Sequence, residues 1–274
     1  MWIFSRFTRK KTDNNKKATH KSDRKVLVIS GWGFRWAYAL WVLKVIEERG
    51  IDQQIDAVYG VSIWAIIWSL WSMWMRADAI LEILTSISIK DFYGNDMLWK
   101  SGWVVSSKKI LKMINEYLPA DFESLRIPFY AWAVDTNKAR YHLFNSWDLH
   151  KIVLWSMSIP GVFPPVKYED YSLVDGWVLN NFPVDLAKKH YPNHKIIWIA
   201  LNKFQLNQRI ESALDNLQVS FEVIMRSKLQ ENTKLVDYLF YRELPISVLS
   251  LNKKQMREAF ALWYKDWIKM FKKD

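Results

Sequence analysis

The sequence has no cysteine, and only 8 of its 274 residues are glycine. The absence of cysteine excludes a disulfide framework and a thiolate metal site, and it favours a reducing compartment such as the cytoplasm. Glycine usually makes up about 7% of a chain, so about 19 would be expected at this length. Hydrophobic residues make up 50% and charged residues 24%, which is typical of a globular protein with a full core.

The net charge of +11 comes mainly from the first 25 residues. They hold nine Lys or Arg and two Asp, whereas the remaining 249 residues carry 30 basic and 26 acidic side chains. We expect residues 1–24 to be a disordered basic tail, which either stays solvated or binds anionic lipid head groups. The tail has no long apolar run, so we expect no secretory signal. Because most of the net positive charge lies in the tail, the charge argues against a nucleic-acid-binding protein.

Tryptophan, in contrast to glycine, is unusually abundant, with 17 residues. Many of them stand where turn chemistry favours glycine, as in "SGWGFRW", "SIWAIIW" and "VDGWVLNN". One interpretation is that the gene uses UGA for glycine and that the printed sequence reads this codon as tryptophan. The alternative is a truly Trp-rich protein whose indoles line a lipid pocket or lie at a membrane interface.

Buried β-branched runs alternate with helical patterns along the chain. Strands are predicted at 26–30, 55–60, 128–135, 139–144, 171–177 and 195–202, and helices at 37–50, 62–75, 77–87, 106–118 and 184–190. This alternation predicts a three-layer α/β/α fold with a mainly parallel central sheet. Without a tandem repeat or a long linker, residues 25–274 are expected to form one domain, with a core at about 25–200 and a helical part at about 205–274.

One stretch, Ala57–Met75, has 19 residues without a charge and is long enough to cross a membrane. Gly60 interrupts it, and serines at 62, 69 and 72 follow. We therefore predict a strand, a turn and a helix rather than a membrane span.

Three stretches could supply the parts of a serine nucleophile's site, namely "GWGFRW" at 31–36, "GVSIW" at 60–64 and "LVDGW" at 173–177. A glycine-bearing loop before a helix can offer backbone N–H groups to an anion, and a serine on a sharp strand-to-helix turn has an exposed hydroxyl. Each signal alone is weak, because a glycine loop after a strand is more often a turn or a nucleotide site, a serine there is more often a helix N-cap, and an aspartate before glycine is most often a turn residue. All three, however, follow predicted strands, where ligand sites of open α/β sheets gather.

Together and in this order, the stretches resemble the patatin-like phospholipases, in particular bacterial ones. The family pattern is a G-G-G-x-R/K-G loop, then G-x-S-x-G, then D-G-G or D-G-A. The matching positions here are Gly31, Trp32, Gly33, Phe34, Arg35 and Trp36, then Gly60, Val61, Ser62, Ile63 and Trp64, then Asp175, Gly176 and Trp177. The resemblance extends from about Lys25 to Ala200. At positions 32, 36, 64 and 177 the family has glycine or another very small residue, and this chain has tryptophan.

The resemblance implies a Ser-Asp dyad, with Ser62 as the nucleophile and Asp175 as the base. Backbone N–H groups of the loop would form the oxyanion hole, with help from Arg35; the loop residues are Gly31, Trp32, Gly33, Phe34 and Arg35. The implied reaction is hydrolysis of fatty-acyl esters of membrane lipids, of phospholipase A or lysophospholipase type, through an acyl-enzyme and without a cofactor or a metal. A Ser-His-Asp triad stays open, since a histidine can approach in space.

The expected partners are a lipid ester substrate and an anionic membrane surface that the basic tail would bind, and no nucleic acid is expected. The expected location is the cytoplasm, peripherally at the inner face of the membrane. The alternative function is that of a catalytically inactive, Trp-rich relative that binds lipid or membrane.

Overall fold

The computed structural model describes residues 23–30, 36–86, 107–160, 163, 165–200 and 229–241, together with scattered positions between 210 and 224. The strands are β1 (Lys25–Ser30), β2 (Ile55–Tyr59), β3 (Phe129–Asp135), β4 (Arg140–Phe144), β5 (Val166–Tyr168), β6 (Tyr171–Asp175), β7 (Lys195–Ala200) and β8 (Tyr238–Tyr241). The α-helices are α1 (Trp36–Glu48), α2 (Ile63–Ser72), α3 (Ala77–Ser86), α5 (Ser107–Tyr117), α6 (Leu149–Ser156), α7 (Val184–His190) and α9 (Leu229–Thr233). Short 3₁₀ helices are η2 (Asp52–Gln54), η4 (Phe122–Ser124) and η5 (Gly176–Val178).

The strands form one sheet in the order β5-β6-β3-β2-β1-β7-β8, and β4 also pairs with β3. Neighbours from β3 to β8 along this order run parallel. The pairs β3–β4, β3–β6 and β5–β6 are antiparallel. The predicted α/β fold with a mainly parallel sheet is confirmed, and an antiparallel extension at one end completes the sheet.

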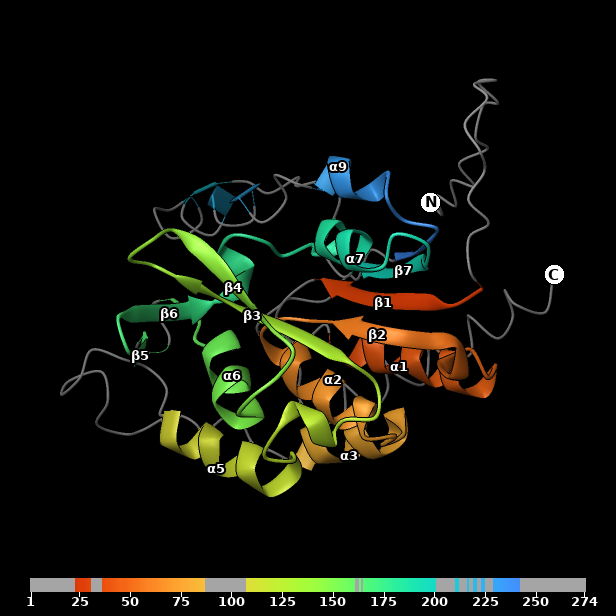
Figure 1. Ribbon diagram of the computed structural model, residues 1–274, viewed down its shortest axis with the longest axis horizontal. Coiled ribbons are helices and arrows are strands. Elements are labelled where there is room, and N and C mark those ends of the chain that lie inside the picture. The colour runs from red at the N-terminus through yellow and green to blue at the C-terminus, as the bar shows by residue number, and fades with distance from the viewer. Residues whose placement is uncertain are drawn as a thin grey trace.

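Helices cover both faces of the sheet, as Figure 1 shows, with α1, α2, α3, α5 and α6 on one side and α7 on the other. Alternate residues of β1 face the two sides of the sheet. Leu27 and Ile29 pack into a core with the larger group of helices, whereas Val26 and Val28 pack into a second core with α7. Because both faces of β1 are buried, the strand reads as a continuous apolar run, and the three predicted layers are confirmed.

The uncharged stretch from Ala57 to Met75 forms most of β2, a turn and α2, as predicted. Nearly all of α2 is buried within the domain. Within the described ranges, no helix is long and apolar enough to cross a membrane.

Two strands and one helix were not predicted, namely β5, β8 and α6. Residues 238–241 form β8, which pairs in parallel with β7 at the edge of the sheet, yet they lie inside the part predicted to be helical, 205–274. A run of four residues is too short to show the alternation of apolar and polar side chains that predicts a strand. Strand β8 therefore forms because it pairs with β7, and no local pattern indicates it.

Helices α1 and α2 end in the same way. Gly50 follows α1 at φ 66°, and Trp74 follows α2 at φ 68°. At each end the left-handed residue donates its N–H to the carbonyl three residues back, and the next residue donates to the carbonyl five residues back, at 2.9–3.3 Å. This is the Schellman arrangement, in which the left-handed position is usually glycine because a Cβ is strained there. The end of α2 therefore has the backbone of a glycine position but carries tryptophan.

Candidate active site

Ser62 lies on the turn between β2 and α2 with a strained backbone, at φ 63° and ψ −133°. A positive φ is uncommon for a residue with a side chain, and such strain persists only where surrounding contacts enforce it. A Cβ atom on the nearby Gly60 would collide with the ring of Trp68 and with Cβ of Trp64, so only glycine fits there. The sequence therefore produces a sharp strand-to-helix turn with serine at its apex, as the motif predicted.

The backbone of this turn is held from outside by the end of α6. The N–H of Ser62 points at both acceptor atoms of Ser156, with 3.1 Å to the carbonyl oxygen and 3.1 Å to Oγ. Ser62 is 6% exposed and Ser156 is fully buried. The strained conformation is thus fixed by a contact between residues 94 positions apart.

Asp175 is the last residue of β6, and its side chain is fully buried. Its N–H donates to the carbonyl of Ser158 over 2.8 Å, and its Oδ1 accepts the N–H of Trp177 over 3.2 Å. Oδ2 has no hydrogen bond of regular geometry among the described residues. A buried carboxyl oxygen without such a partner is unusual, and it is available to a ligand or a proton.

The two residues meet because β3 is staggered along the sheet. The last two residues of β2 pair with the first two of β3, so β3 continues beyond the point where β2 ends. β6 runs antiparallel to β3 and places Asp175 opposite Ala133. Ser62 follows a strand and Asp175 ends one, as predicted, but the strand of Asp175 runs antiparallel to its neighbour β3. The stagger, and not a shared strand direction, brings its carboxyl to Ser62.

Burial raises the pKa of the Asp175 carboxyl to about 8, because the charged form is desolvated. The Ser62 hydroxyl lies close enough to lower this pKa in part by hydrogen bonding, and the N–H groups of Trp177 and Gly176 lower it further. The resting carboxyl therefore holds its proton at neutral pH and becomes a stronger base than an ordinary aspartate once it is ionised.

The other predicted site positions divide into two groups. Trp36 begins α1, Trp64 lies in the first turn of α2 and Trp177 follows Gly176 in η5, and all three indoles are buried. A Cβ on Gly176 would meet the ring and the carbonyl of Trp132, so glycine is required there. The predicted oxyanion residues, Gly31, Trp32, Gly33, Phe34 and Arg35, lie outside the described residues.

The four histidines among the described residues lie next to groups other than Ser62 and Asp175. His150 contacts the carbonyl of Leu118 at 2.9 Å, and His190 contacts the Tyr59 hydroxyl at 2.8 Å. The remaining two, His142 on β4 and His194 before β7, lie beside Tyr171 and Asp56, respectively. Within the described ranges no histidine makes a hydrogen bond with Ser62 or Asp175. The same ranges contain no cluster of three or more His, Asp or Glu that could hold a metal ion.

Sequence reasoning missed Ser156 and Ser158, which hold the backbones of the two predicted site residues. The available signal was weak, namely two serines in "WSMSIPG", before a stretch rich in proline. A buried serine that bonds a distant backbone has no spacing rule, so only the fold reveals its partner.

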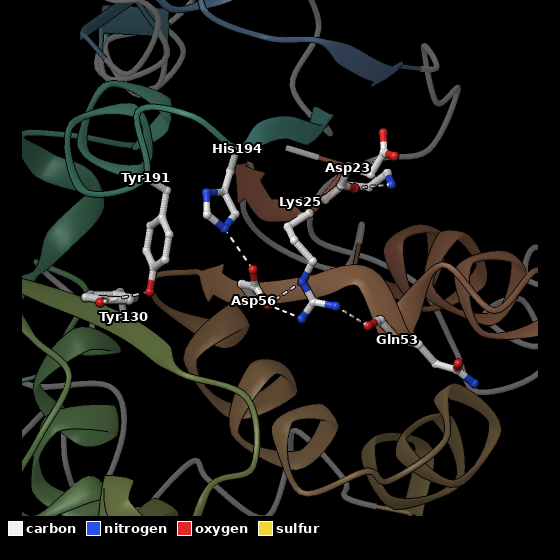
Figure 2. Close-up of polar contacts among 8 residues, drawn as sticks. Asp23, Lys25, Gln53, Asp56, Tyr130, Tyr191 and His194 are labelled. Carbon is white, nitrogen blue, oxygen red and sulfur yellow. Dashed lines mark hydrogen bonds and ion pairs between the residues drawn. The ribbon is translucent and has the colours of Figure 1, made fainter. Parts of the chain in front are cut away.

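A second aspartate, Asp56, lies at the opposite end of the strands, where β1, β2 and β7 begin. Arg24 donates Nε–H to its Oδ1 over 2.8 Å, and His194 lies 2.8 Å from its Oδ2. Figure 2 shows His194 reaching down to Asp56 from the segment before β7. The hydrogen bond from Arg24, followed by that with His194, holds the pKa of this carboxyl below its usual value against partial burial.

Comparison with known proteins places the chain in a family. Neuropathy target esterase sws of Drosophila melanogaster is 28% identical over 167 residues, which cover 58% of this chain and 12% of that protein. The Drosophila persimilis protein is 29% identical over 164 residues, or 57% of this chain and 11% of that protein. The matched part of the chain thus spans about a tenth of the length of these curated relatives.

The crystal structure of VipD from Legionella pneumophila has a similar fold, with a TM-score of 0.53 and 14% identity, over 92% of this chain and 67% of that one. The family model described as patatin-like phospholipase matches residues 27–188, which is more than half of the chain and includes both Ser62 and Asp175. The chain belongs to the patatin-like phospholipase family.

Proposed function

We propose that this chain is a serine acyl hydrolase that cleaves fatty-acyl esters of membrane lipids, as a phospholipase A or lysophospholipase, through a dyad of Ser62 and Asp175. The observation that carries the proposal is the pairing of a strained serine with a buried aspartate whose Oδ2 lacks a regular hydrogen bond. Family membership and relatives named as esterases support lipid ester hydrolysis. The bacterial origin remains a prediction.

The reaction proceeds in two acyl transfers. Ser62 Oγ attacks the ester carbonyl carbon while its proton passes to the ionised carboxyl of Asp175. The tetrahedral intermediate collapses, the C–O bond to the alcohol breaks, and Asp175 returns the proton to the departing alcohol oxygen. Water then loses a proton to Asp175 and attacks the acyl-enzyme, and the fatty acid leaves as Ser62 recovers its proton. A raised pKa suits the base, because a carboxyl at an ordinary pKa of about 3.9 would hold the transferred proton weakly.

The proposed oxyanion hole is the loop at 31–35, which joins the end of β1 to the first residue of α1. Backbone N–H groups at the start of a helix are unpaired and suit a developing negative charge. β1 is the direct neighbour of β2, and Ser62 follows β2, which supports an approach of this loop to the nucleophile.

We also propose that the gene reads UGA as glycine at motif positions 32, 36, 64 and 177. Two further tryptophans support this decoding, because Trp74 has φ 68° and Trp147 has φ 86°. A left-handed backbone is rare for a bulky residue and ordinary for glycine. Tandem mass spectrometry of the native protein from its own cells tests the proposal. Glycine at these positions would restore all three motifs, and tryptophan would contradict the decoding.

The alternative function, an inactive Trp-rich relative that binds lipid, requires the tryptophans to be genuine, and two buried indoles are held as genuine tryptophans would be. Trp68 donates its N–H to the Tyr59 carbonyl over 3.0 Å, and Trp132 donates to the carbonyls of Gly176 and Asn180. Buried tryptophans usually have such partners. Under this alternative, the chain would bind lipid without hydrolysing it.

Ester hydrolysis by the wild-type chain and by Ser62→Ala decides between the two functions. Ser69→Ala is the matched control, because Ser69 is also buried and its hydroxyl bonds only within α2, to the Ala65 carbonyl over 2.7 Å. The hydrolase predicts release of fatty acid from phospholipid vesicles by the wild type and the control, and at least about a thousandfold less by Ser62→Ala. Equal rates in all three proteins would reject it.

Residues 1–24 supply the proposed contact with anionic lipid, at the inner face of the membrane. The observation behind this is the charge, since most of the net +11 lies in the first 25 residues. Sedimentation with vesicles that contain phosphatidylserine should fall sharply when residues 1–22 are deleted, and also when salt is raised from 0.1 to 0.5 M. Undiminished binding after the deletion would rule out the tail.

A further inference from the structure

The last residue of α6, Ser156, contacts the predicted nucleophile through its backbone and its side chain at once. We propose that Ser156 is a positioning residue, and that residues 156–158 hold the nucleophile and the base at a set separation. This inference rests on the proposed roles of Ser62 and Asp175.

The first observation is the shared hydrogen bond of the Ser62 N–H. This N–H precedes the first turn of α2, where no carbonyl of that helix can accept it. The carbonyl and Oγ of Ser156 both lie 3.1 Å away and supply the acceptors from another helix. Because Ser62 has a left-handed φ of 63°, its backbone would relax toward an ordinary helical start without such an external hold.

The second observation is that the base is anchored two residues further along the same segment. The Asp175 N–H donates to the Ser158 carbonyl over 2.8 Å. Consecutive Cα atoms are about 3.8 Å apart, so the two anchoring residues lie within about 7.6 Å of each other. The covalent chain from Ser156 to Ser158 therefore limits how far the nucleophile and the base can move apart.

The third observation is that α6 is itself firmly placed. Asp148 caps the start of the helix by accepting the Lys151 N–H over 3.0 Å, and four apolar side chains of the helix are at most 3% exposed within the domain, namely Leu149, Ile152, Val153 and Trp155. The helix ends where the contacts with both site residues begin. A rigid, buried helix is a suitable support, because a small misplacement of reacting groups costs a large factor in rate.

The hydroxyl of Ser156 is the part of this arrangement that mutation can remove. Ser156→Ala keeps the carbonyl acceptor and deletes Oγ, and Ser156→Thr keeps a hydroxyl. Ser156→Cys is nearly isosteric with a weaker acceptor and replaces the Ala variant if that variant does not fold. Ser69→Ala again serves as the control, because it removes a buried hydroxyl that bonds only to its own helix. Thermal unfolding establishes that each variant is folded.

Two readouts separate a positioning role from a structural one. The first is kcat and KM on a soluble p-nitrophenyl ester. The second is hydrogen exchange of the Ser62 amide, measured in the full-length chain by mass spectrometry or NMR, which needs no turnover. We expect Ser156→Ala to lower kcat about tenfold to a hundredfold with KM nearly unchanged, and to speed exchange of the Ser62 amide about tenfold. Ser156→Thr should restore both values to within about threefold, and the control should change neither.

An Ala variant that behaves as the control does in both readouts would overturn the inference. A fall in unfolding temperature with unchanged kcat and unchanged Ser62 exchange would reduce Ser156 to a packing residue and would also overturn it. If the wild-type chain shows no hydrolysis, the proposed function fails, and amide exchange alone then decides whether Ser156 holds the Ser62 backbone.

Discussion

Asp175 and Asp56 lie on the same sheet, but their surroundings act on their charge in opposite ways. Asp56, at the end where the parallel strands begin, is partly exposed and has Arg24 and His194 as partners, so its pKa is lowered. Asp175 is fully buried, has no cationic partner among the residues that the structure describes, and has its pKa raised to about 8. The surroundings of Asp56 stabilise its negative charge, whereas burial makes a negative charge on Asp175 unfavourable. The Asp56 carboxylate has hydrogen-bond partners on the segments that precede β1 and β7. The buried Asp175 carboxyl instead binds a proton more strongly than an ordinary aspartate does.

The largest expected effect is on catalysis. Asp175→Asn should lower ester hydrolysis by at least about a thousandfold, because the nucleophile loses its base. Asp56→Asn makes the same chemical change at the other end of the strands and should leave the rate within about twofold of wild type. Initial rates on one ester with both variants measure the contrast. Similar losses in the two variants would break the distinction between the aspartates.

The second prediction concerns stability at high pH. A carboxyl whose folded pKa is raised holds its proton in the folded state, so its ionisation destabilises the fold as pH rises from about 4 toward 8. Asp175→Asn removes this penalty, so its free energy of unfolding relative to wild type should increase by about 4 kcal/mol from pH 5 to pH 8. Urea unfolding at both pH values tests this. A stability difference that stays the same at both pH values would contradict the raised pKa.

The pH dependence of the rate follows from the same carboxyl. Asp175 acts as a base only when ionised, so kcat/KM should rise about tenfold per pH unit below pH 8 and level off above it. The expected gain from pH 6 to pH 8 is about 50-fold. Ser156→Thr is a useful companion, since it should keep the midpoint. A profile that is already flat at pH 6 would mean that Asp175 is ionised at that pH.

The smallest expected effect is the loss of the contact at Asp56. A lowered pKa means that this carboxylate stabilises the fold above about pH 4 and that this contribution is lost as pH falls through the folded pKa. Asp56→Asn should therefore lower the free energy of unfolding by about 1 kcal/mol at pH 7 and by almost nothing near pH 2. Chemical denaturation at the two pH values gives the difference. High salt should shrink it, because the site is partly exposed.

Most of the order of the elements was predictable because most of the strands and helices have a local signal, although β5, β8 and α6 were not predicted. The apolar run before Ser30 is buried on both faces, and the spacing after Trp36 is helical, so both were found at nearly their observed bounds. β8 was not predictable, since four residues at a sheet edge show no periodicity. The antiparallel direction of β6 was also missed, because strand direction depends on pairing and not on composition.

The site was predicted from motifs. The motifs identified the residues but could not indicate which other side chains lie next to them in the fold. Ser62 and Asp175 are 113 positions apart, and only the stagger of β3 explains why they approach. The raised pKa depends on burial, which no spacing rule gives for a single aspartate. Ser156 was beyond reach for the same reason, since its contact with Ser62 joins two segments that share no sequence pattern.

The short segment that contacts both site residues also has a consequence for how the protein can change over time. Substitutions near Ser62 and near Asp175 share this support, so their effects on activity should not add, even where the altered side chains do not touch. A change that shifts the end of α6 moves both backbones together, and a second change at either one would have to match it. Variation around this site is therefore expected to be epistatic, with tolerated substitutions at 156–158 depending on the residues that flank positions 62 and 175.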